Sequence, residues 1–248
     1  MTNQTSALQD KTILVTGAGD GIGKAVAIAS ARQGATVILL GRTVKKLEHV
    51  YDDIEAEGGP QPAIFPLNLE NSGEENYLQL NEIVSKEFST LHGLIHCATN
   101  LGSLTPMALY DTELWHKVFQ VNVHACYQLT RALIPCLNKS NNASVIFSVS
   151  QQALQGTAYW GAFGTTQAAL KGMMEIFADE YENDGIIRFN CLDPGPVASH
   201  FRRTAYPAEE PATQASPESV VAPYLHLLSE SSKTINGKLL QIDDAIFQ

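Results

Sequence analysis

The sequence predicts an α/β protein with a doubly wound parallel sheet of about seven strands and helices on both faces. Three observations lead to this prediction. Short runs rich in β-branched residues alternate with helical patterns from one end of the chain to the other. These runs show little polar alternation, as expected of parallel strands that are covered on both faces. One helical pattern separates each run from the next, which favours right-handed crossovers.

The elements follow one another in a regular order. The expected strands lie at residues 12–16, 36–40, 63–67, 93–96, 144–149, 186–192 and 238–242. The expected helices lie at residues 22–33, 43–57, 74–88, 112–137, 158–181 and 217–228. Gly34 ends the first helix, because glycine readily adopts the left-handed conformation that follows a helix. Pro135 is expected to bend the end of the long fourth helix, because proline lacks a backbone N–H.

The domain organisation predicted from the sequence is simple. A length of 248 residues permits one or two domains, and a sheet of this kind commonly stays one domain, so we expect a single domain over residues 1–248. Residues 196–217 form an irregular segment with four prolines. The segment follows a strand end, where open α/β sheets bind ligands, so we interpret it as a substrate lid. A passive surface loop is the alternative.

Composition excludes several classes of partner. The formal net charge of −10 repels phosphate backbones, so no nucleic acid is expected. No apolar run is long enough to span a membrane, and the first ten residues lack the apolar core of a signal peptide, so we expect a cytoplasmic protein with no membrane partner. The histidine and cysteine spacings fit no metal signature, so no metal is expected. The four cysteines are expected to be free thiols; they are Cys97, Cys126, Cys136 and Cys191.

A glycine-rich turn links the first strand to the first helix and reads TGAGDGIG over residues 16–23. Gly17 permits the sharp turn, Gly21 lets the backbone approach a pyrophosphate, and Gly23 lets the helix pack close to the strand. The start of the helix offers free N–H groups and a partial positive charge to phosphates. The turn therefore predicts a dinucleotide site that includes Gly17, Gly19, Asp20, Gly21, Ile22 and Gly23.

The spacing T-G-x-x-x-G-x-G resembles that of the short-chain dehydrogenase/reductase family, and the resemblance covers nearly the whole chain. Asn122 resembles the family's helix-bending asparagine and Ser150 its catalytic serine. Pro194-Gly195 resembles the P-G pair that passes beside the nicotinamide, and Ser199 stands where the family often has threonine. Residues 160–181 are similar to a little-characterised bacterial branch.

The resemblance implies a Rossmann-like fold, an oxidoreductase, and a nicotinamide dinucleotide as the bound partner, with an unknown small-molecule substrate. It also implies a homodimer or homotetramer, because family members usually associate through the fourth and fifth helices. The apolar content of residues 112–137 and 158–181 fits such an interface, and fits packing against the sheet equally well.

The end of the second strand indicates which cofactor is preferred. Members that prefer NAD usually place an acidic residue where Gly41 stands, and here Arg42 follows it directly. A guanidinium pairs with a 2′-phosphate and stacks on adenine, and Thr43 and Lys45 could assist it. We therefore expect NADP(H) rather than NAD(H). Asp20 argues against this preference, since NADP-binding members often carry a basic residue in the turn. A solvated surface arginine is the alternative interpretation of Arg42.

By the same resemblance, further residues are expected at the cofactor. Asn68 replaces the aspartate that accepts a hydrogen bond from the adenine amino group, and its amide oxygen can still accept one. Thr99 replaces a glycine and is expected to narrow the adenosine side of the groove. The expected set also includes Leu69, Ala98, Pro194, Gly195 and Val197.

The catalytic pair implied by the resemblance is missing. The family uses Y-x-x-x-K on the fifth helix, where the tyrosine is the general acid/base and the lysine lowers the tyrosine's pKa and holds the nicotinamide ribose. Here Phe163 and Gln167 occupy these positions, and the thirteen-residue step from Ser150 to Phe163 supports this alignment. General acid–base catalysis contributes ~10²–10⁴-fold in rate, so ordinary carbonyl reduction is expected to be weakened or lost. Ser150 and Asn122 are retained.

Other residues could replace the missing groups. Tyr159 and Lys171 share the helical face but are displaced by one turn, about 5.4 Å, which is too far for unaltered proton transfer. We expect Tyr159 to line the pocket or start the helix, and Lys171 to be solvated. His96 and His200 stand near strand ends and could donate a proton, or could simply be polar edge residues.

Three functional hypotheses remain open from the sequence. The first is an NADP(H)-dependent oxidoreductase with weakened chemistry. The second is a non-catalytic dinucleotide-binding or regulatory protein of the same fold. The third is a structural subunit that binds nothing. The intact glycine turn, Arg42 and Pro194-Gly195 argue against the third, and Phe163 with Gln167 favours the second over the first.

Overall fold

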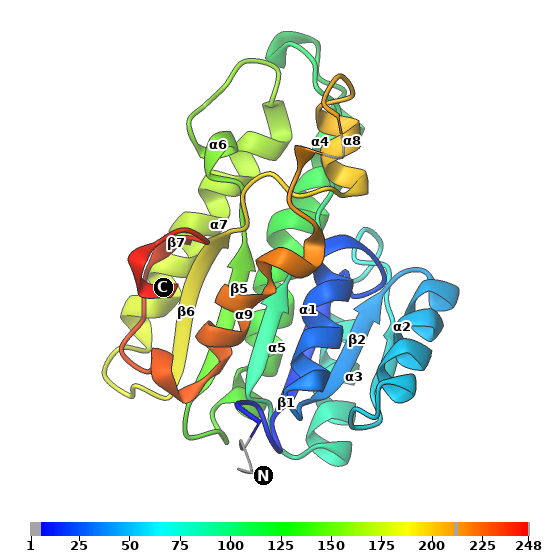
Figure 1. Cartoon of the computed structure of the whole chain (residues 1–248). Coiled ribbons are helices and arrows are strands. Elements are labelled where there is room, and N and C mark those ends of the chain that lie inside the picture. Colours follow the sequence, from blue (N-terminus) through cyan, green and yellow to red (C-terminus); the bar gives the residue numbers. More distant parts are fainter. Residues whose placement is uncertain (1–5, 211–212, 248) are drawn as a thin grey trace.

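The computed structural model describes residues 6–210 and 213–247. Within them, seven parallel strands form one sheet in the order β3-β2-β1-β4-β5-β6-β7 (Figure 1), which confirms the predicted fold class. The strands are β1 (Thr12–Thr16), β2 (Thr36–Gly41), β3 (Ala63–Pro66), β4 (Gly93–His96), β5 (Ala143–Ser148), β6 (Ile187–Asp193) and β7 (Leu239–Gln241).

Helices cover both faces of the sheet. They are α1 (Gly21–Arg32), α2 (Val44–Ala56), α3 (Glu74–Glu87), α4 (Thr112–Phe119), α5 (Ala125–Leu137), α6 (Gln151–Leu154), α7 (Gly161–Glu180), α8 (His200–Ala205) and α9 (Val221–Leu228). Helices α1, α2 and α9 pack over one face, and α3, α5 and α7 pack over the other (Figure 1). The molecule therefore has two hydrophobic cores, one on each side of the sheet.

Strand β1 shows why its run lacks polar alternation. Leu14 packs into the core under α3 and α5, whereas Ile13 and Val15 pack into the core under α1 and α2. All three side chains are fully buried. Successive side chains of a strand point to opposite faces, and here both faces are covered, so both sets are apolar. Burial of each such side chain stabilises the fold by about 1.5–3 kcal/mol.

Three predicted helices differ from the structure. The expected helix 217–228 begins with a 3₁₀ helix at Pro217–Val220, and α9 follows from Val221. The expected helix 112–137 is interrupted by a π-helical turn at Gln120–His124, which separates α4 from α5. Such a turn adds a residue to the helical repeat and occurs frequently at functional sites. The expected helix 158–181 begins only at Gly161, because Tyr159 has a left-handed φ of 73° that a helix does not allow.

The expected irregular segment 196–217 contains a helix that the sequence analysis missed. Ser199 precedes α8, and its hydroxyl accepts a hydrogen bond from the Arg202 backbone N–H at 3.1 Å. Such a side-chain cap satisfies one of the free donors at a helix start. Val197 and Ala215 also form a parallel bridge. Residues 211–212 of the predicted lid lie outside the described residues.

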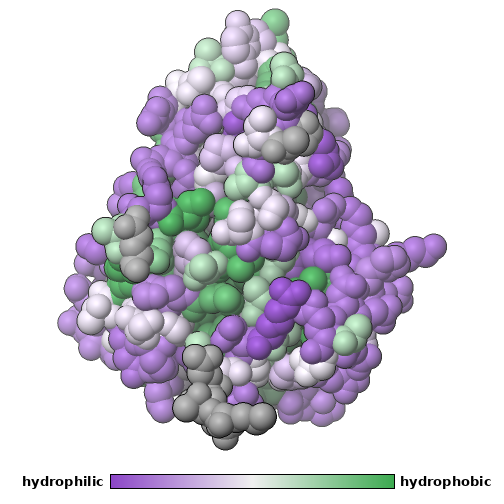
Figure 2. All heavy atoms as spheres, viewed as in Figure 1, coloured by the Kyte–Doolittle hydropathy of each residue, from purple (hydrophilic) through white to green (hydrophobic). Residues whose placement is uncertain are grey.

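The surface is unevenly polar. Figure 2 shows apolar side chains gathered over α9 and beside β7, while hydrophilic side chains cover α2. Across residues 6–210 and 213–247, no helix combines the length and the apolar character needed to cross a membrane.

His96 gives a testable pH dependence of stability. Burial lowers the pKa of His96 from 6.5 to about 3. The unfolded chain takes up a proton below about pH 6.5 and the folded chain does not, so stability falls as the pH drops through this range. We predict that His96 accounts for about 2 kcal/mol of stability lost between pH 7 and pH 5.

Urea unfolding at both pH values measures this loss. His96→Gln removes the titrating ring and should flatten the dependence by about that amount, relative to the unmodified chain. An unchanged slope in this variant contradicts the assignment.

Candidate functional site

A cavity of about 560 Å³ opens at the carboxyl ends of the strands. Strands β2 and β3 lie on one side of β1, and β4 to β7 lie on the other. The connection after β1 therefore runs toward one edge of the sheet, and the connection after β4 runs toward the other edge. Open α/β sheets bind ligands where the strand order reverses in this way. The Thr16 hydroxyl accepts hydrogen bonds from the backbone N–H groups of Cys97 and Ala98, both at 3.1 Å. These bonds fasten the ends of β1 and β4 together at the cavity floor.

The structure brings all but one of the predicted site residues to this cavity. Its lining includes Gly17, Gly19, Asp20, Gly21, Ile22, Gly23, Arg42, Asn68, Leu69, Ala98, Ser150, Phe163, Gln167, Pro194, Gly195 and Val197. Asn122 is the exception and lies behind the wall, buried. These residues are far apart in the sequence, and the fold brings them to one cavity. Their roles remain predictions.

The glycine turn has the shape that the sequence predicts. A Cβ atom at Gly23 would lie 2.4 Å from the Gly17 carbonyl oxygen, so only glycine permits this packing of α1. Gly21 has a φ of +52°, and a Cβ there would meet nothing closer than 3.7 Å. Among the described residues, no acceptor faces the backbone N–H of Ile22 or Gly23. Two free donors at a helix start therefore face the cavity and fit a phosphate group.

Asp20 is paired. Its carboxylate accepts hydrogen bonds from the Gly21 backbone N–H at 2.8 Å and from Lys46 Nζ at 2.5 Å. The hydrogen bond from Lys46 is the main reason that the pKa of Asp20 is lowered. Arg42, Thr43 and Lys46 line the cavity, whereas Lys45, which the sequence analysis named with Thr43 as able to assist Arg42, does not. Asp20 could have indicated Lys46 from the sequence, because a carboxylate beside an expected phosphate site needs a nearby cation to offset its charge.

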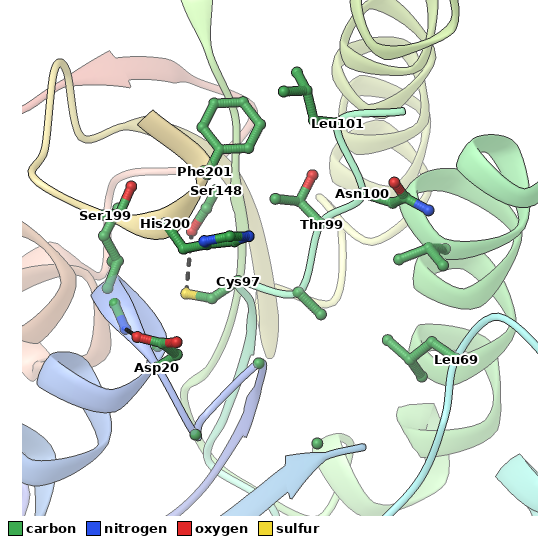
Figure 3. Close-up of a pocket in the computed structure, with 18 of the residues that line it drawn as sticks. Asp20, Leu69, Cys97, Thr99, Asn100, Leu101, Ser148, Ser199, His200 and Phe201 are labelled. Atoms are coloured by element: carbon green, nitrogen blue, oxygen red, sulfur yellow. Dashed lines mark hydrogen bonds between the residues drawn. The ribbon is translucent and has the colours of Figure 1, made fainter. Parts of the chain in front are cut away.

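Figure 3 shows the middle of the cavity. Thr99 and Asn100 follow β4 on one side, and His200 projects from α8 on the other, above Cys97. Leu69 lies across from Asp20 and is buried. Asn68 beside it is exposed, and its side-chain oxygen accepts a hydrogen bond from the Glu70 backbone N–H at 3.2 Å. The Asn68 oxygen is thus already engaged, although it can accept a second bond.

Asn122 fastens the segment after β4 to the helix behind it. Its Oδ1 accepts from the Asn100 backbone N–H at 2.8 Å, and its Nδ2 donates to the Asn100 carbonyl at 2.9 Å. The Nδ2 also donates to the Thr166 hydroxyl on α7 at 3.1 Å. The π-helical turn places this side chain between the two elements. Asn122 therefore shapes the cavity wall without facing the cavity.

Gln167 and Ser150 contact each other at the position where the resemblance places a catalytic centre. The Gln167 Oε1 accepts a hydrogen bond from the Ser150 backbone N–H at 2.9 Å. Within the part of the chain that the structure describes, neither the Gln167 amide nitrogen nor the Ser150 hydroxyl has a hydrogen-bond partner, and both residues line the cavity. The two groups are therefore available to a ligand.

Phe163 packs into an aromatic cluster beneath α8. Its ring centroid lies 5.0 Å from that of Phe201 and 5.6 Å from that of Trp160. The side chain is 3% exposed. Aromatic pairs at such distances contribute about 0.5–1.5 kcal/mol beyond area burial. The side chain at this position therefore joins α7 to α8 and has no proton to donate.

The alternative proton donors are placed differently. Tyr159 is 59% exposed and does not line the cavity; of its two expected positions, it takes the one near the helix start, just before the residue that caps α7. Lys171 is exposed to solvent, as expected, and pairs with Glu175. His96 points into the core, where its Nε2 lies 2.9 Å from the Thr130 hydroxyl and its ring stacks on Phe147, so it faces no ligand. His200 alone of these four lines the cavity.

The remaining polar groups of the cavity include neutral side chains at the ends of β4 and β5 and the carboxyl group of Asp193 at the end of β6, whose pKa is raised by burial. Cys97 Sγ lies 3.3 Å from the Ser148 hydroxyl, which lies 2.9 Å from the Tyr224 hydroxyl. Burial raises the pKa of the Cys97 thiol to about 12, so the reactive thiolate does not form near neutral pH. Among the residues placed in the structure, no three His, Cys, Asp or Glu side chains gather as metal ligands.

This sheet order, glycine turn and strand-end cavity define the short-chain dehydrogenase class. The family model described as short chain dehydrogenase matches residues 11–210, and the chain belongs to that family. It is 41% identical over 230 residues to the uncharacterized oxidoreductase YciK of Escherichia coli strain K12, covering 93% of this chain and 90% of the relative.

Solved structures are similar over their whole length. A short-chain dehydrogenase of Shigella flexneri 2a strain 301, crystallised with NADP, matches with a TM-score of 0.93 and 39% identity, over 96% of this chain and 99% of that chain. One of Escherichia coli CFT073, crystallised with NADPH, matches with a TM-score of 0.93 and 40% identity, over 97% of this chain and 99% of that chain.

The bonds of Asn122 give a stability prediction. Asn122→Ala leaves the Asn100 N–H and C=O without their partners in a partly buried setting, so we expect a loss of about 2–3 kcal/mol in urea unfolding. Asn122→Asp keeps the acceptor but not the donors and should lose an intermediate amount. A loss below about 0.5 kcal/mol for Asn122→Ala would contradict this role.

Proposed function

We propose that this protein binds NADP(H) in the cavity at the carboxyl ends of the strands. The observation that carries the proposal is the pair of unpartnered N–H groups, of Ile22 and Gly23, beside a glycine turn that leaves room for a pyrophosphate. Arg42 lines the same cavity, and position 41 before it is a glycine rather than an acidic residue. Two relatives of high similarity were crystallised with NADP or NADPH, which supports the phosphorylated cofactor.

The nicotinamide end of the cofactor is proposed to lie at Ser150, Gln167 and Pro194-Gly195. A bound nicotinamide supplies hydride transfer. The free Gln167 amide is proposed to donate to a ribose hydroxyl, and the Ser150 hydroxyl to donate to a carbonyl oxygen. Both groups are neutral, so neither supplies the positive charge that a lysine would bring to this point.

We infer that ordinary carbonyl reduction is weakened or lost. Phe163 and Gln167 replace the expected acid and its cationic neighbour, and loss of general acid catalysis alone removes ~10²–10⁴-fold in rate. Ser150 alone can polarise a carbonyl but is a poor proton donor. The protein is thus proposed to be an oxidoreductase by family, with little turnover of ordinary carbonyl substrates.

A non-catalytic dinucleotide-binding or regulatory role is the second candidate. The observation that favours it is the packing of Phe163, on α7, against Phe201 on α8, together with the hydrogen bond from the Ser150 backbone N–H to Gln167. Both residues at the catalytic positions hold neighbouring elements in place. The segment 196–217 is then a lid, and its residues Phe201, Ala205 and Tyr206 pack in the aromatic cluster with Trp160 and Phe163.

Binding and turnover separate these candidates. NADPH and NADH are titrated by fluorescence, and a broad panel of carbonyl compounds is assayed with the unmodified chain and with Phe163→Tyr/Gln167→Lys. We expect tight NADPH binding, with turnover appearing only in the double variant. Robust turnover by the unmodified chain overturns the inference that carbonyl reduction is weakened or lost. If the chain binds neither cofactor, the proposed function is overturned.

We further infer a homodimer or homotetramer that associates through α5 and α7. A second cavity of about 580 Å³ lies on this face and is lined by Tyr127, Met173 and Phe177. Ile176 lines the same cavity and is 61% exposed, so it extends an apolar patch on this face. The four cysteines are free, in keeping with the reducing cytoplasm proposed as its location.

The oligomer is tested by light scattering during gel filtration. Ile176→Lys buries a charge in the proposed interface and is expected to shift the mass toward the monomer. Ile246→Lys, at an exposed position outside this face, serves as the control and should leave the mass unchanged. A monomeric unmodified chain contradicts the inference.

A further inference from the structure

Asp20 places a negative charge at the very point where the proposed function puts phosphates. It cannot easily turn away, because its carboxylate caps α1 through the Gly21 N–H at 2.8 Å. The side chain is 60% exposed, and it lines the cavity together with Arg42. A bare carboxylate here would repel the 2′-phosphate of NADP(H).

Lys46 compensates this charge. Its Nζ lies 2.5 Å from Asp20 Oδ2, and it lines the cavity from the first turn of α2. The pair therefore joins the start of α1 to the start of α2, on either side of the cavity rim. We propose that Lys46 determines the preference for a 2′-phosphate by neutralising Asp20. This inference rests on the proposed NADP(H) site.

The local charge decides which cofactor is favoured. With Lys46 present, the Asp20–Lys46 pair is neutral and Arg42 leaves a net charge of about +1 beside the phosphate, which carries about −1.5 to −2. When Lys46 is replaced by a neutral residue, the charges of Asp20 and Arg42 cancel, and the Asp20 carboxylate faces the ligand without its partner. A free carboxylate accepts hydrogen bonds from ribose hydroxyls, as in dinucleotide sites that select NAD. Loss of Lys46 should therefore weaken the binding of NADP(H) and leave the binding of NAD(H) nearly unchanged.

The exposure of the Lys46 side chain determines how strongly its loss should change the cofactor preference. The Lys46 side chain is 54% exposed, so solvent and salt screen its interaction with a ligand. A change of about tenfold in the ratio of dissociation constants is expected, rather than the far larger change that a buried charge would give. The change should shrink as the ionic strength rises.

The chain offers a matched control. Lys24 on α1 pairs with Asp53 on α2 at 2.8 Å, with side chains 40% and 46% exposed. This second ion pair joins the same two helices, and neither of its residues lines the cavity. Lys24→Met thus removes a similar link between α1 and α2 without changing the charge at the proposed phosphate site.

The experiment measures dissociation constants for NADPH and NADH by fluorescence, with the full chain, for five variants and the unmodified protein. The variants are Lys46→Met, Lys46→Arg, Asp20→Asn, Asp20→Asn/Lys46→Met and Lys24→Met. Asparagine caps a helix as well as aspartate does, so Asp20→Asn removes the charge and keeps the cap. Thermal unfolding checks that each variant is folded, and Lys46→Gln replaces Lys46→Met if that variant is not.

We expect Lys46→Met to lower the ratio Kd(NADH)/Kd(NADPH) about tenfold, mainly through weaker NADPH binding. Lys46→Arg and Lys24→Met should keep the ratio of the unmodified chain. Asp20→Asn should raise the ratio, and the double variant should return to within about threefold of the unmodified protein.

Two results overturn the inference while the proposed function stands. A ratio within about twofold of the unmodified chain for Lys46→Met shows that Lys46 does not set the preference. A double variant as impaired as Lys46→Met shows that Lys46 acts on the phosphate itself and not through Asp20. If the unmodified chain binds neither cofactor, the proposed function fails first and the inference falls with it.

Discussion

The reversal of strand order between β1 and β4 is the constraint on which the rest of this structure depends. Because all strands are parallel, every carboxyl end reaches the same edge of the sheet, and the connections diverge only at this one step. The Thr16 hydroxyl holds the two strand ends together through the backbone after β4. The glycine turn, Arg42, Asn68 and Ser150 each follow a different strand, yet line one cavity for this reason.

The end of the cavity that Ser150, Phe163 and Gln167 line is held together by contacts between side chains and backbone. Asn122 holds the segment after β4 against α7 with four hydrogen bonds of 2.8–3.3 Å. On α7 itself, Gln167 accepts from the Ser150 backbone and Phe163 packs beneath α8. Both side chains thus contribute to the wall of the cavity. Binding relies largely on backbone donors and shape, whereas proton transfer requires one particular side chain.

Electrostatics near the glycine turn differ from those of the whole molecule. The net charge of −10 would by itself disfavour an anionic ligand. The free N–H groups at the start of α1 offer a partial positive charge, and Arg42 adds a full one. Lys46 offsets the carboxylate of Asp20 in the glycine turn, and Glu70 and Asp193 line other parts of the same cavity. A small region can therefore favour phosphate in a strongly acidic protein, because screening confines these interactions to about 10 Å.

The sequence by itself determined the order of the elements, the glycine turn and the strand ends that carry the site, because these depend on local periodicity and on residues such as Gly23. Tertiary structure decided the rest. Both faces of β4 are apolar, so only packing could turn His96 toward Thr130 and away from the cavity. The pairing of Asp20 with Lys46 joins residues 26 positions apart, which no local pattern specifies. The π-helical turn depends on contacts of Asn122 with two distant segments, so the helical pattern of residues 112–137 concealed it.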